Sequence, residues 1–144
     1  MDVLIQKSEG SHEYEITIKC REIPALLIET LNALQKDMFL LGHIEGKVHH
    51  VAIESILYFE TVDKKVFFYT ENQVFTSNQK LYQLENTLIN DSFIRVSKQT
   101  IVNLKKVKNI SSYSGSRLLL TFDNNEKVVV TRGFVPLLKE RLGI

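Results

Sequence analysis

From Phe39 to the C-terminus, the sequence consists of short stretches of strand-forming residues separated by turn residues. Glu45-Gly46, Glu71-Asn72 and Asp123-Asn124-Asn125 each separate two such stretches, and residues of these types favour the tight turns of hairpins. Only two segments in this region, Lys80–Leu88 and Phe134–Leu142, have the pattern of short helices. The sequence therefore predicts a mainly β fold of small antiparallel sheets with a few short helices.

The first 42 residues have a different pattern. Glu13–Lys19 alternates polar and apolar residues, as a half-buried strand does, and Pro24–Met38 carries its apolar residues at helical spacing. Pro24 suits the first turn of a helix, because the backbone N–H that proline lacks has no partner there. One strand and one helix cannot bury their own apolar faces. We therefore expect residues 1–42 to pack on the rest of the chain or on another subunit.

The composition is that of an ordinary globular domain with a small appended element. The 144 residues are 44% hydrophobic and 24% charged, and the single cysteine, Cys20, excludes an internal disulfide. No apolar run approaches the roughly 18 residues that a membrane-spanning helix needs, and the first residues lack the pattern of a signal peptide. We expect a cytoplasmic protein without membrane insertion.

The charges are divided unevenly along the chain, although the net charge is only +1. Residues 1–42 hold four basic and seven acidic residues, whereas residues 43–144 hold 14 basic and ten acidic residues. The positive field therefore belongs to the C-terminal part, which is where we expect an anionic partner to bind.

Motifs of catalysis and of metal binding are absent from the sequence. It contains no G-x-G-x-x-G, no P-loop and no H-E-x-x-H. His43 and His49 lie on opposite strands of the Glu45-Gly46 hairpin and could face each other. With Glu45 they could bind a transition metal, but three ligands without a recognised spacing are a weak metal signal. We expect exposed hairpin histidines, no cofactor, no metal and no enzymatic activity; a small metal-dependent enzyme is the least favoured class.

The segment from Ser92 to Lys108 is the most informative part of the chain for function. It carries five basic residues and no acidic residue, and its strand-forming residues lie on both sides of a polar corner, Ser97 to Thr100. This pattern predicts two short strands joined by a cationic corner. Such a corner presents hydrogen-bond donors to an anionic, patterned partner, and nucleic acid is the first candidate.

Other basic residues also fall at strand junctions. Lys64 and Lys65 lie in a predicted turn, Arg117 follows a Gly-Ser turn, and Arg132 follows the last strand directly before Gly133. Cations on loops that a rigid sheet holds in place are typical of binding sites, whereas a single one is typical of a solvated surface. Together with Arg95 and Lys98, they favour a binding surface.

Four sequence blocks resemble the LytTR family of bacterial DNA-binding domains. They are I-E-S-I-L-Y-F-E-T-V-D-K-K-V (53–66), L-x-x-L-E-x-x-L (81–88), F-I-R-V-S-K-Q-T-I-V-N-L (93–104) and V-V-V-T-R-G-F-V-P-L-L (128–138). The F-x-R-V-S-K-x-x-I-V-N signature is specific, and the order of the blocks matches the family. The resemblance implies a LytTR DNA-binding domain at residues 43–144, preceded by an N-terminal strand–helix extension at residues 1–42. That extension is similar to those of short stand-alone regulators and is too small for a receiver domain.

The resemblance also implies a fold and a binding mode. The fold is an elongated arrangement of small antiparallel sheets, and loops rather than a recognition helix enter successive major grooves. Base-contacting positions of the family fall on the Asp63-Lys64-Lys65 turn, on Lys98 and on Arg132. Relatives carry His in the first turn, so Lys64 is preferred there with Lys65 as its rival, and many read H-R-S or H-N-S where this chain has Ser97-Lys98-Gln99. The full set of expected DNA-binding residues is Lys64, Lys65, Arg95, Ser97, Lys98, Gln99, Arg117, Arg132 and Gly133.

The function that follows is that of a sequence-specific bacterial transcription regulator, an output domain without its own receiver. Expected partners are duplex DNA at direct-repeat promoter sites, a second copy of the chain as a homodimer, and a small membrane protein encoded nearby as the input. The alternative is a module for RNA or single strands, in which Tyr58, Phe59, Phe67, Phe68 and Tyr69 provide stacking surfaces.

The polar corner allows a sharper expectation about individual side chains. Apolar residues on both sides should anchor the corner in the core, so that Ser97, Lys98 and Gln99 all project outward. Asn103 follows the second strand, and we expect its amide to bind the backbone of the adjacent turn rather than DNA.

Overall fold

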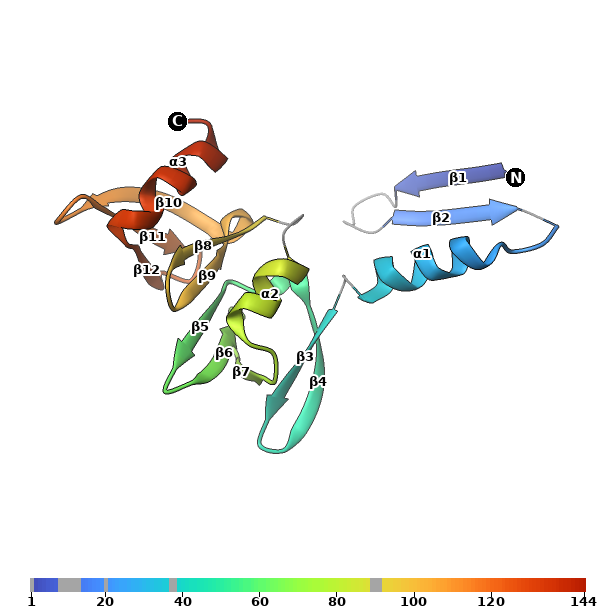
Figure 1. Ribbon diagram of the computed structural model, residues 1–144, viewed down its shortest axis with the longest axis horizontal. Coiled ribbons are helices and arrows are strands. Elements are labelled where there is room, and N and C mark those ends of the chain that lie inside the picture. The colour runs from blue at the N-terminus through green and yellow to red at the C-terminus, as the bar shows by residue number, and fades with distance from the viewer. Residues whose placement is uncertain (1, 8–13, 20, 37–38, 89–91) are drawn as a thin grey trace. The chain divides into compact units, whose positions relative to one another are not determined.

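The computed structural model describes residues 2–7, 14–19, 21–36, 39–88 and 92–144 (Figure 1). The chain divides into two compact units, Met1–Gln35 and Lys36–Ile144. The sequence places the boundary after residue 42, which is later than this division. The strand Phe39–Ile44 belongs to the large sheet of the second unit, so that unit begins before residue 42.

The first unit consists of a hairpin and a helix. Strand β1 (Asp2–Lys7) pairs with β2 (Tyr14–Lys19) in antiparallel register, and α1 (Ala25–Lys36) follows. The predicted strand and helix are confirmed, and the Pro24 carbonyl accepts the first-turn N–H of Leu27 at 3.0 Å. Strand β1 was not predicted, because three successive apolar residues interrupt its alternation. Leu26 of this helix is 73% exposed, so this apolar side chain is not buried.

The second unit contains a seven-stranded and a three-stranded sheet, both antiparallel. The strand order of the large sheet is β4-β3-β7-β6-β5-β9-β8, and that of the small sheet is β10-β11-β12. The strands are β3 (Phe39–Ile44), β4 (Lys47–Ala52), β5 (Tyr58–Val62), β6 (Lys65–Tyr69), β7 (Val74–Ser77), β8 (Phe93–Ser97), β9 (Thr100–Asn103), β10 (Val107–Tyr113), β11 (Arg117–Phe122) and β12 (Lys127–Val130). The helices are α2 (Leu81–Thr87) and α3 (Val135–Leu142), with single 3-10 turns η1 (Ile53–Ser55), η2 (Leu104–Lys106) and η3 (Arg132–Phe134). The predicted mainly β fold is confirmed.

Two hydrophobic cores hold the second unit together. The α2 core joins the leucines of α2 to one face of the large sheet, and Phe59, Phe68 and Leu84 are completely buried there. The α3 core joins the other face of β8 and β9 to the small sheet and to α3, and Phe122 and Leu138 are completely buried there.

Strands β8 and β9 contribute to both cores. Successive side chains of a strand point to opposite faces, so Ile101 packs in the α2 core and Val102 in the α3 core. The same division separates Phe93 from Ile94. A strand pair that is buried on both faces is rigid, and it carries the corner that the sequence singles out.

The hairpin of β3 and β4 does not bring its histidines face to face. His43 pairs with Val48, and His49 pairs with Gly42, so the two histidines point to opposite faces of the hairpin and the weak metal signal has no counterpart in this register. His43 contacts the Asn78 amide at 3.2 Å instead. Gly42 lets β3 approach the core, because a Cβ there would lie 2.7 Å from Phe68 Cζ.

Candidate nucleic-acid interface

Three connections that carry expected DNA-binding residues lie side by side at one end of the sheets. Strand β5 pairs with both β6 and β9, and the Thr61 N–H donates to the Gln99 carbonyl at 2.8 Å. The β5–β6 turn and the β8–β9 turn are therefore adjacent. The Thr131 N–H donates to the Val96 carbonyl at 3.0 Å, which places Arg132 beside the β8–β9 turn.

The β5–β6 turn consists of Asp63 and Lys64. Both have positive φ, 49° and 65°, the backbone conformation of the two-residue turns that match the twist of a hairpin. Lys64 and Lys65, the first residue of β6, are both exposed. Both ammonium groups are thus available to an anionic partner, and the choice between them stays a prediction.

The β8–β9 turn exposes Lys98 and Gln99 but not Ser97. Ser97 is 7% exposed, and its Oγ accepts the Gln99 N–H at 3.2 Å. The expectation that all three side chains project outward is therefore wrong for Ser97. The reason is a bulge: one extra residue lies in β8 between Arg95 and Ser97, so that Val96 and Ser97 are both buried in place of the usual alternation.

Arg95 is held by the protein itself. Its Nε donates to Glu85 Oε2 at 2.6 Å, and its Nη1 donates to the Lys98 carbonyl at 2.6 Å. The side chain is 19% exposed. Glu85 belongs to α2, and no sequence pattern indicates that this helix reaches the turn.

The third connection is the 3-10 turn η3 after the last strand. Arg132 is exposed there, and Thr131 anchors the turn, because its Oγ1 also donates to the Val96 carbonyl at 3.3 Å. Gly133 is exposed, its φ is not in the left-handed region, and a Cβ added to it would meet no protein atom within 4 Å. The fold itself thus does not require glycine at this position.

Arg117 lies on another hairpin. Its Nε donates to the Ser114 carbonyl at 2.7 Å, its Nη2 donates to Ser114 Oγ at 3.1 Å, and its guanidinium lies 4.7 Å from the centre of the Tyr113 ring. Leu118 pairs with Val130, so the start of β11 lies beside the end of β12, which Thr131 and Arg132 follow. The structure therefore brings Lys64, Lys98 and Arg132 together and places Arg117 on the hairpin next to Arg132.

At the far end of β9, Asn103 is 1% exposed. Its Nδ2 donates to the Ile56 carbonyl at 3.0 Å, and its Oδ1 accepts the Lys105 N–H at 3.1 Å and the Ser92 hydroxyl. The prediction that Asn103 binds the backbone of the adjacent turn is confirmed.

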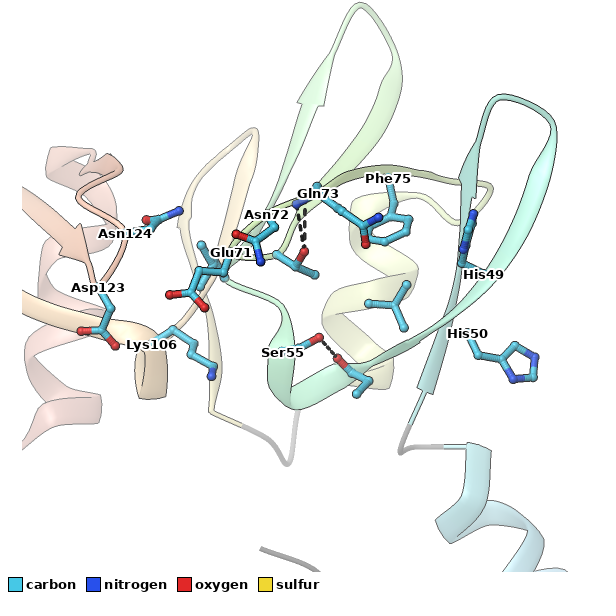
Figure 2. Close-up of a pocket in the computed structure, with 14 residues that line it drawn as sticks. His49, His50, Ser55, Glu71, Asn72, Gln73, Phe75, Lys106, Asp123 and Asn124 are labelled. Carbon is cyan, nitrogen blue, oxygen red and sulfur yellow. Dashed lines mark hydrogen bonds between the residues drawn. The ribbon is translucent and has the colours of Figure 1, made fainter. Parts of the chain in front are cut away.

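A polar cavity of about 500 Å³ lies at the opposite ends of the same strands (Figure 2). It is bordered by β4 and η1, by the β6–β7 turn, by η2 and by the β11–β12 turn. Glu71, Asp123 and Lys106 all line it, so both signs of charge are present. Sequence reasoning missed this cavity, because its walls come from segments far apart in the chain. Its two carboxylates make it a poor site for phosphate.

The aromatic residues of β5 and β6 are mostly used inside the protein. Phe59 and Phe68 are completely buried, and Tyr58 stacks on Tyr69 and on Phe122. Tyr69 donates to Glu60 Oε2 at 3.2 Å. Burial is the main cause that raises the pKa of both tyrosine hydroxyls above the ordinary value, and nearby carboxylates add to it. Phe67 is half-buried as well, so none of the five rings is fully exposed, as the open stacking surface of a single-strand module would be.

Within the described ranges, no three His, Cys, Asp or Glu side chains gather as a metal site would require. No helix in those ranges is long and apolar enough to cross a membrane.

The fold is a mainly β domain whose exposed cations lie on adjacent turns. Residues 46–143 match the LytTr DNA-binding domain, and the chain belongs to this LytTR family. The LytTr domain of a putative methyl-accepting/DNA response regulator from Bacillus cereus superposes with a TM-score of 0.71 at 29% identity, covering 74% of this chain and 98% of that one.

The chain is also similar to curated relatives in Staphylococcus aureus. An uncharacterized HTH-type transcriptional regulator of strain MRSA252 is 30% identical over 118 residues, which cover 82% of this chain and 80% of the relative. Its counterpart in strain NCTC 8325 is 29% identical over the same length. In this chain, α2 and α3 are separated by five strands, so these two helices do not form a helix-turn-helix.

Proposed function

We propose that this protein is a sequence-specific transcription regulator that inserts its three adjacent connections into successive major grooves of duplex DNA. The single observation that supports this most strongly is the pair of backbone hydrogen bonds from Thr61 and Thr131, which fix three cation-bearing turns beside one another. Exposed Lys64, Lys98 and Arg132 lie on those turns. A rigid sheet scaffold with cationic loops is suited to reading base edges.

The three turns have different roles in this proposal. Arg132 contacts a guanine through its O6 and N7, because the guanidinium fork matches these two acceptors. Lys98 contacts a second base and Lys64 a third, with Gln99 and Lys65 beside them. Gly133 lets the backbone of η3 approach the DNA closely. The protein itself has room for a side chain at this position, so the need for glycine comes from the DNA. Arg117 contacts a phosphate from its separate hairpin.

The wider setting of the proposal comes from the family. We expect binding at direct-repeat promoter sites, a homodimer on such sites, and a membrane protein encoded nearby as the source of the signal. Because bacterial DNA lies in the cytoplasm, the protein acts there. The expectation that it has no enzymatic activity stays a prediction, as does the division into an extension of residues 1–42 and a DNA-binding domain of residues 43–144.

A duplex enriched from a random library by the wild-type protein provides the test. Arg132→Ala should cost about 1–3 kcal/mol of binding free energy on this duplex and relax discrimination at one base pair. Lys105, an exposed lysine on η2, is the control. Lys105→Ala should weaken enriched and random duplexes equally or change neither. Equal losses from both variants on both duplexes would reduce Arg132 to a phosphate contact.

The dependence on salt tests the class of partner. If Lys64, Lys65, Lys98, Arg117 and Arg132 together offset about five phosphate charges, log Kd should rise with log[salt] with a slope of about 4 to 5 per domain, from about 0.9 per phosphate. A slope near zero would contradict nucleic-acid binding. Tighter binding of single-stranded RNA than of any duplex would instead support the alternative function.

A further inference from the structure

Arg95 and Glu85 form a connection between helix α2 and the turn that carries Lys98. The Arg95 guanidinium has two described partners, Glu85 Oε2 and the Lys98 carbonyl, each at 2.6 Å. These are short, charge-assisted hydrogen bonds, which are stronger than neutral ones. The guanidinium thus holds the peptide group that follows Lys98.

Helix α2 is a fixed support for this connection. Leu81, Leu84 and Leu88 are buried in the α2 core, and the Lys80 N–H donates to Gln83 Oε1 at 2.9 Å at the start of the helix. Glu85 lies one helical turn after Leu81, at the edge of the buried face, and is 49% exposed. The packing of the leucines therefore fixes the backbone that carries this carboxylate.

The rest of the turn backbone is also satisfied by neighbours. Ser97 Oγ accepts the Gln99 N–H, and the Gln99 carbonyl accepts the Thr61 N–H. The Lys98 carbonyl is also paired, because it accepts a hydrogen bond from the Arg95 guanidinium. Without Arg95, the peptide between Lys98 and Gln99 would be held through its N–H alone, by Ser97 Oγ. The direction of the Lys98 side chain would then be less strictly fixed.

A direct phosphate contact by Arg95 fits these observations less well. Its side chain is only 19% exposed, and the Glu85 carboxylate neutralises its charge. Glu85 also lines, with Arg95 and Lys98, a groove that continues to Phe134 and Leu137 near η3. An acidic residue beside a DNA-binding turn repels phosphate, so its presence there needs a compensating role.

We propose that Glu85 and Arg95 are positioning residues that orient Lys98 for base contact and do not touch the DNA themselves. This inference rests on the proposed function and adds a specificity-determining pair to it. The pair contributes by reducing the conformational freedom of the turn before DNA binds.

The effect of Glu85→Gln on affinity has opposite signs under the two explanations. If Glu85 positions Lys98, the variant should bind the enriched duplex at least about threefold more weakly, because a misdirected side chain loses part of one base contact. If Glu85 only repels DNA, the variant should bind enriched and random duplexes more tightly. Glu140→Gln is the control, since Glu140 is an exposed acid on α3. It should bind both duplexes equally well or slightly more tightly.

Arg95 is tested by the salt slope and by a conservative variant. Arg95→Gln should lower affinity for the enriched duplex and leave the slope unchanged, whereas loss of a phosphate contact would reduce the slope by about 0.9. Arg95→Lys keeps the charge but loses the planar fork. It should therefore fail to restore affinity for the enriched duplex.

Dependence on Lys98 separates positioning from general stability. In a Lys98→Ala background, Glu85→Gln should cause no further loss of specific affinity, because the side chain that it positions is gone. Melting temperatures of all variants give the folded fraction under the binding conditions. Additive losses in the double variant, or an unchanged affinity in Glu85→Gln, would overturn the pair alone. Failure of the wild-type protein to prefer any duplex over random DNA would overturn the proposed function and the pair with it.

Discussion

The two ends of strand β9 both carry polar residues, and the structure uses them in opposite ways. At the start of the strand, Lys98 and Gln99 are exposed, and among the described residues neither side chain has a hydrogen-bond partner. At the end, Asn103 is buried and makes three hydrogen bonds within the protein. The two ends are separated by only Thr100, Ile101 and Val102.

The difference shows that a polar side chain is available to an outside partner only where the nearby backbone N–H and carbonyl groups already have hydrogen-bond partners. At Asn103 the strand gives way to a 3-10 turn, and the side chain satisfies the buried Ile56 carbonyl and the partly buried Lys105 N–H. At Lys98 the turn backbone already has partners in Arg95, Ser97 and Thr61. Its side chains are therefore available to a partner outside the protein.

Asn103→Ala should have the largest effect on stability. It leaves the Ile56 carbonyl and the Lys105 N–H without their partner, and each unsatisfied buried group costs about 1–3 kcal/mol. We expect the free energy of unfolding to fall by about 3 kcal/mol in urea denaturation, with the DNA affinity of the folded fraction unchanged. Asn109, an exposed asparagine in β10, is the control. A similar loss from Asn109→Ala would show that burial at the end of β9 is not the cause.

Lys98→Ala should have the reverse effect. An exposed substitution changes stability by no more than about 0.5 kcal/mol, but loss of one base contact should lower affinity for the enriched duplex about tenfold. Fluorescence anisotropy measures this affinity, and Lys105→Ala at the other end of β9 is the matched control. The comparison of the two ends fails if Lys105→Ala loses as much specific affinity as Lys98→Ala.

Ser97→Ala should have an intermediate effect on both properties. It removes the hydrogen bond to the Gln99 N–H, which is worth about 0.5–1.5 kcal/mol, and it loosens the turn without removing a side chain that contacts DNA. Unfolding and binding should both weaken, and binding less than in Lys98→Ala. Ser111, exposed in β10, is the matched serine. An unchanged unfolding free energy in Ser97→Ala would mean that the turn does not need this hydroxyl.

Gly133→Ala should have the smallest effect on stability, within about 0.5 kcal/mol, because the added Cβ meets no protein atom. Gly42→Ala should destabilise the protein clearly, since its Cβ would lie 2.8 Å from Phe75 Cδ1 as well as close to Phe68. Melting temperatures compare the two variants. A large loss in Gly133→Ala would show that the fold, rather than a partner, requires this glycine.

The sequence predicted most of the fold because its signals are local. Turn residues such as Glu45-Gly46 mark the ends of strands, and the continuous apolar run around Ile101 and Val102 fits a strand pair buried on both faces. The positions of Lys98, Arg132 and Asn103 follow from the same patterns and from the family resemblance.

The remaining features depend on contacts between segments that are distant in the sequence. The bulge that buries Ser97 changes the alternation by one residue, and no local signal marks it. Arg95 is held by a carboxylate from another element, and the register of β3 and β4 separates His43 from His49. The cavity near Lys106 needs three turns to meet. Each of these features depends on tertiary contacts, which the periodicity of the sequence does not reveal.

A titration of isotope-labelled protein with the enriched duplex, followed by amide chemical shifts, tests the central claim most directly. The claim is that the end of the sheets with free cationic side chains binds DNA and that the opposite end does not. Shifts should concentrate in residues 63–65, 97–99 and 131–133, with little change at Asn103 and at Glu71–Gln73. Shifts concentrated around the cavity residues Glu71 and Asp123, with none at Lys98 and Arg132, would contradict the account.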